Sequence, residues 1–221
     1  MERGTKIGLV CAMREELGQL EARAARRARH VGLELLEIEL EGGPLLACVA
    51  GIGKVAAARA AAALVSAGAE RGLLVVGVCG GLRGHLVPGT LVHCTTAVQT
   101  DFARHEGREV HSEVALRRAW RAVAPGTEGY FLTADRPVLS LWRRLRLARA
   151  FRGDCVADME TAAVAAVAAG AGVPWAALRS VTDQATGLGA LSFKLHYRSQ
   201  AGRAADTVPA LLASLGSAPA P

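Results

Sequence analysis

The sequence predicts an α/β fold with a central mixed, mostly parallel sheet flanked by helices. Short β-branched or apolar runs alternate along the chain with longer segments whose apolar residues recur at helical spacing. This order is typical of a sheet covered by helices on both faces. The run 73–78 (LLVVGV) is the most continuous apolar stretch, as expected of a central strand buried on both sides. A chain of 221 residues is long enough to form one domain without crosslinks.

The expected strands are the short apolar runs. They are, in chain order, 6–11, two runs within 33–50, then 73–78, 90–98, 130–133, 154–157 and 174–181. Gly42 and Gly43 separate the two runs of 33–50, which is typical of a hairpin turn. The stretch from Thr161 to Leu178 is uncharged and long enough to raise the question of a membrane span. Because glycines and Pro174 interrupt it, we interpret it as a helix, a turn and a buried strand.

The expected helices lie between these strands. They are 14–27, 53–67, 113–123, 139–150, 160–169 and 197–215. In the first, Leu17, Leu20 and Ala24 recur at helical spacing, and the second is rich in alanine. Two arginine clusters, 23–29 and 143–152, are interpreted as solvated helix faces. The polar segment 101–109 has no apolar periodicity and predicts a loop, and 216–221 is expected to form a flexible tail.

Composition and charge narrow the function classes. The formal net charge is +6, but aromatic residues make up only 4%; a nucleic-acid surface would interleave stacking aromatics with its basic groups, so no nucleic-acid partner is expected. Five widely spaced cysteines indicate buried thiols in a reducing compartment. No Cys or His spacing fits a metal site. The beginning of the chain shows no signal-peptide pattern, so a cytoplasmic protein without a membrane span is expected.

Three acidic residues follow three different expected strands: Glu16, Glu160 and Asp183. In open α/β sheets, ligands bind beyond the carboxyl ends of the strands, which makes these acids candidates for a functional site. Each also has a structural interpretation, because carboxylates favour the first turn of a helix and Asp183 could cap a turn. Glu160 and Asp183 bracket a segment whose only charged residue is Arg179. An acid so close to a buried element favours the functional interpretation.

Two glycine motifs also need an explanation. The segment 51–56 (GIGKVA) fits a relaxed dinucleotide-binding pattern, but the next strand ends without the acid that would bind the ribose. A phosphate-binding loop is excluded as well, because its motif requires serine or threonine after the lysine and here Val55 follows Lys54. The segment 77–81 (GVCGG) lets backbone approach a ligand, or it forms a tight turn; both interpretations stay open. Within it, Cys79 is interpreted as a buried thiol rather than a nucleophile.

Several segments together resemble one known family. They are 7–17 (IGLVCAMREEL), 51–58 (GIGKVAAA), 80–82 (GGL), 87–92 (VPGTLV), 158–163 (DMETAA), 178–183 (LRSVTD) and 191–193 (LSF). In this order, across nearly the whole chain, they resemble the methylthioadenosine/S-adenosylhomocysteine nucleosidases of the purine nucleoside phosphorylase superfamily. The resemblance implies a three-layer fold of the nucleoside phosphorylase type over 1–221, a single domain and a homodimer.

The resemblance also implies an activity, the hydrolysis of the N-glycosidic bond of a 5′-modified adenine nucleoside in purine and methionine salvage. Asp183 then corresponds to the general acid that protonates N7 of adenine, and Glu16 to the base that activates water. No cofactor or metal is implied. The substrate-binding positions carried over are Met159, Glu160, Arg179, Thr182, Val138, Phe193, Ile52 and Gly80. Among them, Glu160 binds the ribose hydroxyls, Met159 packs against the sugar, and Arg179 and Thr182 orient the acids.

The chain departs from the family pattern at three places. Val78 replaces a serine, Pro137 replaces the phenylalanine that stacks on adenine, and 101–111 lacks the aromatic residues that help close the partner's pocket. The 5′ substituent is therefore left open, with futalosine and adenosylhopane-type nucleosides as related branches. The alternatives are a phosphorolytic enzyme, with Arg14, Arg179 or Arg83 and Gly80 binding inorganic phosphate, and a non-catalytic nucleoside-binding protein.

Overall fold

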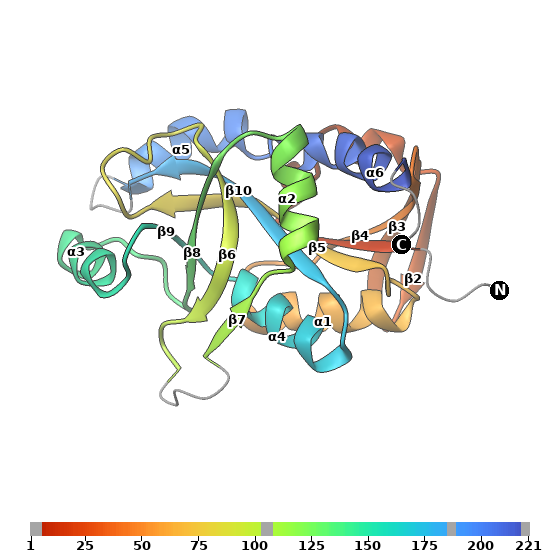
Figure 1. Ribbon diagram of the computed structural model, residues 1–221, viewed down its shortest axis with the longest axis horizontal. Coiled ribbons are helices and arrows are strands. Elements are labelled where there is room, and N and C mark those ends of the chain that lie inside the picture. Colours follow the sequence, from red (N-terminus) through yellow and green to blue (C-terminus); the bar gives the residue numbers. More distant parts are fainter. Residues whose placement is uncertain (1–5, 103–107, 185–188, 218–221) are drawn as a thin grey trace.

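A computed structural model describes residues 6–102, 108–184 and 189–217, without the side chains of 189–194. The strands are β1 (Ile7–Cys11), β2 (Arg26–His30), β3 (Leu33–Leu40), β4 (Gly43–Val49), β5 (Gly72–Gly81), β6 (Leu91–Gln99), β7 (Glu109–His111), β8 (Thr127–Thr133), β9 (Asp154–Asp158) and β10 (Trp175–Asp183). The α-helices are α1 (Lys54–Ser66), α2 (Val114–Val123), α3 (Leu141–Ala150), α4 (Thr161–Ala171), α5 (Gly189–Gln200) and α6 (Val208–Gly216), and the 3₁₀ helices are η1 (Arg14–Arg23) and η2 (Ala205–Thr207). Figure 1 shows this arrangement.

The strands form one mixed sheet, as predicted. Its order is β10-β6-β8-β9-β5-β1-β4-β3-β2, with β7 attached to β6. The central neighbours β4, β1, β5 and β10 run parallel to one another, whereas β2, β3 and β4 form an antiparallel edge. An additional pairing joins β10 to β5, so that β5, β10, β6, β8 and β9 close into a ring.

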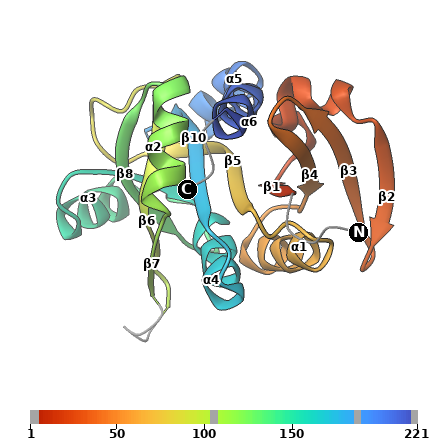
Figure 2. The ribbon, with the colours of Figure 1, turned by 45° about the vertical axis from the view of Figure 1, so that its right-hand side comes forward.

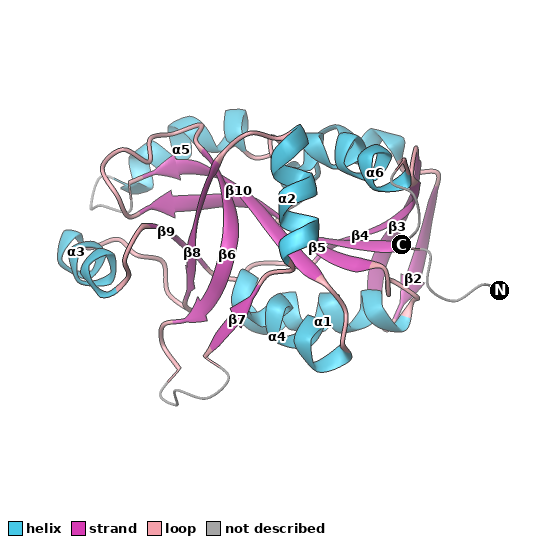
Figure 3. Cartoon of the chain, in the orientation of Figure 1, coloured by secondary structure: helices cyan, strands magenta, loops and turns pink. Residues whose placement is uncertain are grey.

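Helices cover both faces of this sheet. Helices α1 and α4 lie together on one face, and α5 and α6 lie on the other (Figures 1 and 2). Figure 3 separates the magenta sheet from the cyan helices. Each face has its own core: alanine-rich sides of α1 and α4 pack against β5 and β10, while Leu17 of η1, Trp120 of α2 and Leu211 of α6 pack on the opposite side. The three-layer prediction is confirmed.

The prediction that 73–78 is the central strand is also confirmed, since β5 lies between β1 on one side and β9 and β10 on the other. The strand is longer than expected and continues to Gly81, with nearly every residue buried. The segment 77–81 is therefore the end of β5 rather than a separate turn. It carries the backbone of this strand into the region where β1, β9 and β10 also end.

The helix expected over 14–27 is wrong in its second half. The segment from Arg14 forms a 3₁₀ helix that Gly18 interrupts with non-helical angles, and it ends at Arg23. Residues Arg26–His30 form β2, which pairs with β3, so the first arginine cluster lies largely on a strand and not on a helix face. Exposed arginines on an edge strand hinder pairing with another sheet edge, which explains a strand without apolar alternation.

The last predicted helix is also corrected. In place of one helix over 197–215, α5 ends at Gln200 and a short η2 leads into α6. The break lies at Gly202, where a Cβ would stand 2.6 Å from the Cα of Gly18; two chain segments can approach so closely only without side chains. The tail expected at 216–221 overlaps the end of α6 at Gly216, and 218–221 lie outside the described residues.

Other expectations agree with the structure. The uncharged stretch 161–178 forms α4, a left-handed turn at Gly172 and the first part of β10, and none of the described helices is long and apolar enough to cross a membrane. All five cysteines are buried and free of disulfides. The loop expected at 101–109 ends in β7, a short strand paired with β6, while 103–107 lie outside the described residues.

Candidate functional site

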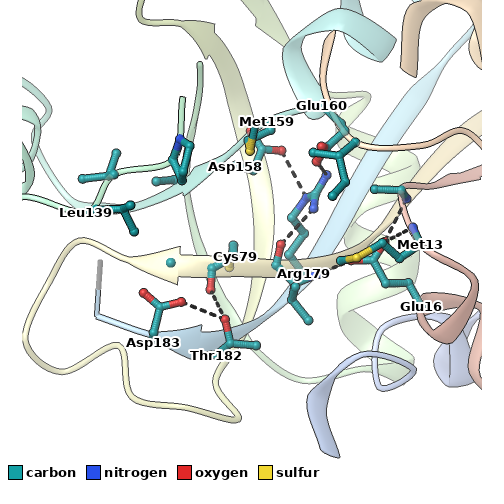
Figure 4. Close-up of a pocket in the computed structure, with 17 residues that line it drawn as sticks. Met13, Glu16, Cys79, Leu139, Asp158, Met159, Glu160, Arg179, Thr182 and Asp183 are labelled. Carbon is teal, nitrogen blue, oxygen red and sulfur yellow. Dashed lines mark hydrogen bonds and ion pairs between the residues drawn. The ribbon is translucent and has the colours of Figure 1, made fainter. Parts of the chain in front are cut away.

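A pocket of about 410 Å³ lies where β1, β5, β9 and β10 end, a volume suited to a small-molecule ligand. Its wall is formed by Ala12, Met13, Glu16, Ile52, Val78, Cys79, Gly80, Pro137, Val138, Leu139, Ala157, Asp158, Met159, Glu160, Arg179, Thr182 and Asp183. Figure 4 shows Asp183 at one end of the pocket and Glu16 at the other, with Met159 and Glu160 above them. The three acids that follow different strands in the sequence therefore share one site.

Glu16 reaches the pocket from η1, immediately after β1, and is 1% exposed. Three backbone N–H groups hold its carboxylate. Ala12 and Met13 donate to Oε2 at 2.8 and 3.0 Å, and Val78 donates to Oε1 at 3.1 Å. Because each carboxylate oxygen has two lone pairs, Oε1 keeps one site for another donor. The carboxylate is thus fixed in direction and can still accept a hydrogen bond from a ligand or water.

Gly77 makes room for this carboxylate. Its φ is +146°, and a Cβ there would lie 2.5 Å from Oε1 of Glu16 and 3.1 Å from Nη1 of Arg179. Any side chain at position 77 would displace the acid. The glycine-rich end of β5 therefore admits a close approach of the Glu16 side chain to the backbone, whereas the sequence suggested such an approach for a ligand.

Burial raises the pKa of Glu16 above the ordinary value of a glutamate. The nearby charge of Arg179 and the N–H donors of Met13 and Val78 oppose this shift, whereas the charge of Glu160 adds to it. A carboxylate whose pKa is shifted toward neutrality is a better proton acceptor than an ordinary glutamate. The environment of Glu16 thus makes its carboxylate a stronger proton acceptor than that of an exposed glutamate.

Arg179 lies beneath the pocket floor with only 2% of its surface exposed. Its Nη2 donates to Oε2 of Glu160 at 3.0 Å, its Nη1 to the carbonyl of Val78 at 2.8 Å, and its Nε lies 3.1 Å from Oδ2 of Asp158. Burial acts to lower the pKa of Arg179, but the charges of Asp158, Glu160 and Glu16 outweigh it and raise the pKa. The guanidinium stays charged and holds the acids in place.

The polar groups behind Arg179 were not among the predicted site residues. Asp158 accepts hydrogen bonds from the hydroxyls of Thr133 and Thr161, and Nε of Arg179 also donates to the Thr161 hydroxyl at 3.2 Å. Asp158 stands two residues before Glu160 and was visible in the 158–163 motif, yet nothing in the sequence places Thr133 beside it. That contact depends on the pairing of β8 with β9.

Asp183 closes β10 at the opposite end of the pocket. A register shift between Val181 and Asp183 interrupts the pairing of β10 with β5. The Asp183 side chain lines the pocket at this irregular end of the strand. The buried hydroxyl of Thr182 donates to Oδ2 of Asp183 at 2.9 Å and lies 3.3 Å from the carbonyl oxygen of Cys79. This hydrogen bond fixes the direction of the Asp183 carboxylate, and the role of Thr182 in orienting the acid remains a prediction from the resemblance.

Glu160 lies at the beginning of α4 and is 4% exposed. Besides Arg179, it accepts the N–H of Gly53 on Oε1 at 2.9 Å. The 51–56 motif thus directs an amide at a protein carboxylate, while Lys54 pairs with Asp101 at 2.7 Å outside the pocket. Each oxygen of Glu160 keeps a lone pair, so that the carboxylate can accept two adjacent hydroxyls.

The rest of the wall is mainly apolar. Val138 is buried, Ile52 and Leu139 are partly open to solvent, and Met159 lies beside Glu160 (Figure 4). All the predicted site residues line the pocket except Phe193, whose side chain lies outside the described residues. Pro137 occupies the wall next to Val138, at the position where the resemblance implies a phenylalanine.

The remaining reactive groups do not suggest other chemistry. Cys79 lines the pocket, but burial raises the pKa of its thiol far above the ordinary value, so the buried-thiol interpretation holds. In the described part of the chain, no group of three His, Cys, Asp or Glu side chains is arranged to hold a metal ion.

Known proteins resemble this chain in sequence and in fold. The chain is 25% identical to a 5′-methylthioadenosine/S-adenosylhomocysteine nucleosidase of Halalkalibacterium halodurans, over 96% of this chain and all of the relative. It superimposes on the S-adenosylhomocysteine nucleosidase of Streptococcus pyogenes in complex with 5-methylthiotubericidin with a TM-score of 0.89 and 23% identity, over 96% and 98% of the chains. The futalosine hydrolase of Helicobacter pylori gives a TM-score of 0.87 and 24% identity over 94% and 97%.

These two structures share the fold of this chain. The sequence profile of the phosphorylase superfamily matches residues 6–213, which includes each of the three acids and all the described strands and α-helices apart from the last residues of α6. The chain belongs to the phosphorylase superfamily, within which it resembles the 5′-methylthioadenosine/S-adenosylhomocysteine nucleosidases.

Proposed function

We propose that the protein hydrolyses the N-glycosidic bond of a 5′-modified adenine nucleoside, of the methylthioadenosine or S-adenosylhomocysteine kind, and releases adenine. The observation that carries this proposal is the buried carboxylate of Glu16, held by three amides across the pocket from Asp183 (Figure 4). A base and an acid on opposite sides of one small pocket fit a reaction that adds water to one end of a bond and a proton to the other.

The proposed reaction assigns a role to each polar group. Glu16 accepts a proton from water, which attacks C1′ of the ribose. Asp183, oriented by Thr182, donates a proton to N7 of adenine, so that the base leaves as a neutral molecule. Glu160 binds the 2′ and 3′ hydroxyls and Met159 packs against the sugar. The reaction uses water and requires no cofactor or metal.

The hydrogen bonds of Arg179 favour water over inorganic phosphate as the nucleophile. Among the described residues of the pocket wall, Arg179 is the only lysine or arginine, and its N–H groups are directed at Asp158, Glu160 and the Val78 carbonyl. The other arginines considered for phosphate lie elsewhere: Arg14 pairs with Glu21 and Glu34, and Arg83 donates to the carbonyls of Phe151 and Gly153. A phosphate would meet carboxylates without a cation to offset them.

The environment of Glu16 also argues against a protein that only binds nucleosides. A carboxylate that only accepts hydrogen bonds from a ligand makes no use of a raised pKa, and the burial that raises it opposes folding. A general base needs this property.

The test is the release of free adenine, followed by chromatography. The candidate substrates are methylthioadenosine, S-adenosylhomocysteine, 5′-deoxyadenosine and aminofutalosine, each with and without phosphate, and inosine is the control. Adenine release without phosphate supports the proposal, and the preferred nucleoside identifies the 5′ group. Release that depends on phosphate would assign the phosphorolytic reaction, and tight binding without release would assign the binding protein.

We also propose that the protein acts in the cytoplasm as a homodimer of single-domain subunits. Support comes from the resemblance and from a shallow groove between α1 and α4, lined by Val55, Ala58, Ala166 and Val167, in which Val55 is 85% exposed. Exposed apolar surface of this kind is typical of a protein contact. Sedimentation velocity tests the proposed dimer. The wild type is expected to sediment as a dimer, and Val55→Glu, which places a charge in the groove, as a monomer.

A further inference from the structure

We infer that α3 and the residues before it form a docking surface for an anionic lipid bilayer. The surface, here called the α3 patch, consists of Leu139, which also borders the pocket, Leu141, Trp142 and Leu145 together with Arg136, Arg146 and Arg149. Its apolar members are 53%, 54%, 80% and 42% exposed in that order. Four large apolar side chains on one short segment are unusual for the surface of a soluble protein.

The position of α3 leaves one side of the helix free. In both ribbon views, α3 lies at the outer end of the molecule, beside β8 and β9 (Figures 1 and 2). Its inner side is held by Leu147 and Ala148, which belong to a core cluster with Leu82 and Cys155. Trp142 and Arg149 lie on the opposite side of the helix, about half a turn from the buried pair, and Leu145 lies on the flank, about a third of a turn away.

The segment that carries the patch, bounded by Asp135 and Asp154, has charge of a single sign. Between positions 136 and 153 the chain contains arginines at 136, 143, 144, 146, 149 and 152 and no aspartate or glutamate. In the described part of the chain, none of these arginines forms an ion pair. Only Arg144 and its neighbour Arg143 turn partly inward, Arg144 toward the Leu82 carbonyl. Among the described residues, the exposed arginines of the patch thus have no carboxylate within ion-pair distance.

This combination fits an anionic bilayer better than other occupants. Leucine and tryptophan enter the interface between headgroups and acyl chains, while the arginines on the flank meet lipid phosphates. The helix is already folded on the protein, so binding does not cost the entropy of forming it. A second copy of the chain docking patch to patch would bring like charges together, and a nucleic acid would leave three leucines in a polar interface.

The chain carries its own probe of this contact. Of its three tryptophans, Trp120 and Trp175 are 0% and 3% exposed, and Trp142 is 80% exposed. A change in tryptophan emission on binding therefore reports the α3 patch. The full-length protein is mixed with phosphatidylcholine vesicles that either contain phosphatidylglycerol or lack it, and both the emission and co-sedimentation with the vesicles are measured.

The expected result is co-sedimentation only with the phosphatidylglycerol vesicles, a shift of the emission to shorter wavelength, and release by high salt. The double variant Arg146→Gln/Arg149→Gln and the single variant Trp142→Ser should each bind the phosphatidylglycerol vesicles more weakly than the wild type, by roughly tenfold or more. The matched control is Arg26→Gln/Arg29→Gln on β2, which removes the same charge from another exposed segment and should bind like the wild type.

Three results would overturn the inference. One is equal binding to both kinds of vesicle, or none to either. Another is equal loss of binding in the β2 control, which would mean that only the net charge of the chain matters. The third is a change in oligomeric state of Trp142→Ser, or competition by an RNA oligonucleotide at the same emission signal, which would assign the patch to a second copy or to nucleic acid. Adenine release by these variants tests the proposed function separately, because none of the altered residues lines the pocket.

Discussion

Arg179 and Glu160 form a hydrogen-bonded ion pair inside the protein, with 3.0 Å between Nη2 and Oε2 and side chains that are 2% and 6% exposed. Removing one partner of such a pair leaves a buried charge incompletely compensated. Because Glu160 comes from the beginning of α4 and Arg179 from β10, the pair also joins the ribose side of the pocket to the centre of the sheet.

Glu160→Ala is therefore expected to act on both stability and recognition. The free energy of unfolding should fall by about 3 kcal/mol, since Asp158 still faces the guanidinium. The KM for ribosides should rise, and the preference for ribosides over 2′-deoxyribosides should disappear. Chemical denaturation and steady-state kinetics measure the two effects; a variant that still discriminates between the sugars would contradict the role of Glu160.

Asp183→Asn tests the acid. An amide of the same shape can occupy the place beside Thr182 but cannot donate a proton as a carboxylic acid does. The expected kcat for adenine nucleosides falls roughly 10²–10⁴-fold, while the Kd measured by calorimetry changes little. A near wild-type kcat would show that another group protonates the base.

Gly77→Ala tests the space behind the Glu16 carboxylate. The new Cβ would stand 2.5 Å from Oε1 of Glu16, so the carboxylate must move away from the Val78 amide. We expect kcat/KM to fall roughly 10²-fold or more, as for loss of a general base. Gly170→Ala is the matched control, since nothing lies within 4 Å of a Cβ there. Equal activity of the two variants would contradict the tight contact.

Thr161→Val tests the positioning of Arg179. Valine keeps the volume of threonine but removes the hydroxyl that contacts both Asp158 and Arg179, at a cost of about 1.5–3 kcal/mol in the free energy of unfolding. Thr161→Ser should recover both stability and activity. A purely structural role predicts lower stability of the valine variant with an unchanged pH profile; a positioning role predicts that the profile moves as well.

The pH dependence follows from the raised pKa of Glu16. The base must be ionised to accept a proton from water, so kcat/KM should fall as the pH drops through this pKa. The fall should occur at higher pH than for an ordinary glutamate. Arg179 lowers the pKa of Glu16; a loosened guanidinium in Thr161→Val should therefore move the acid limb to still higher pH. An acid limb at the ordinary glutamate value would contradict the burial argument.

Much of the site could be predicted because strands that run parallel end at one edge. Glu16 and Asp183 follow β1 and β10, both parallel to β5, and the rule for ligands at carboxyl ends places them together. The hydrogen bonds around the carboxylates of the site could not be predicted. The Val78 amide reaches Glu16 and the Thr133 hydroxyl reaches Asp158 only through strand register, which single residues do not reveal.

The fold was predictable where composition is distinctive, as in the alanine-rich α1 and the continuous apolar run of β5. The prediction failed where contacts with distant segments decide the structure. Strand β2 has no apolar alternation, because it lies at the sheet edge and is held by backbone pairing with β3. The end of α5 is set by the contact of Gly202 with Gly18, two residues far apart in the sequence. Neither feature has a local signal.

The amide cradle of Glu16 has a consequence for how the protein acquires its activity. Two of the amides follow β1 and the third belongs to β5, 62 positions from the acid. The base therefore reaches its active geometry only when these two strands have paired in the correct register. During refolding, catalytic competence should recover later than helical circular dichroism, since helices form from local contacts and this pairing must close a long loop. Enzymatic activity thus serves as a sensitive reporter of native sheet assembly.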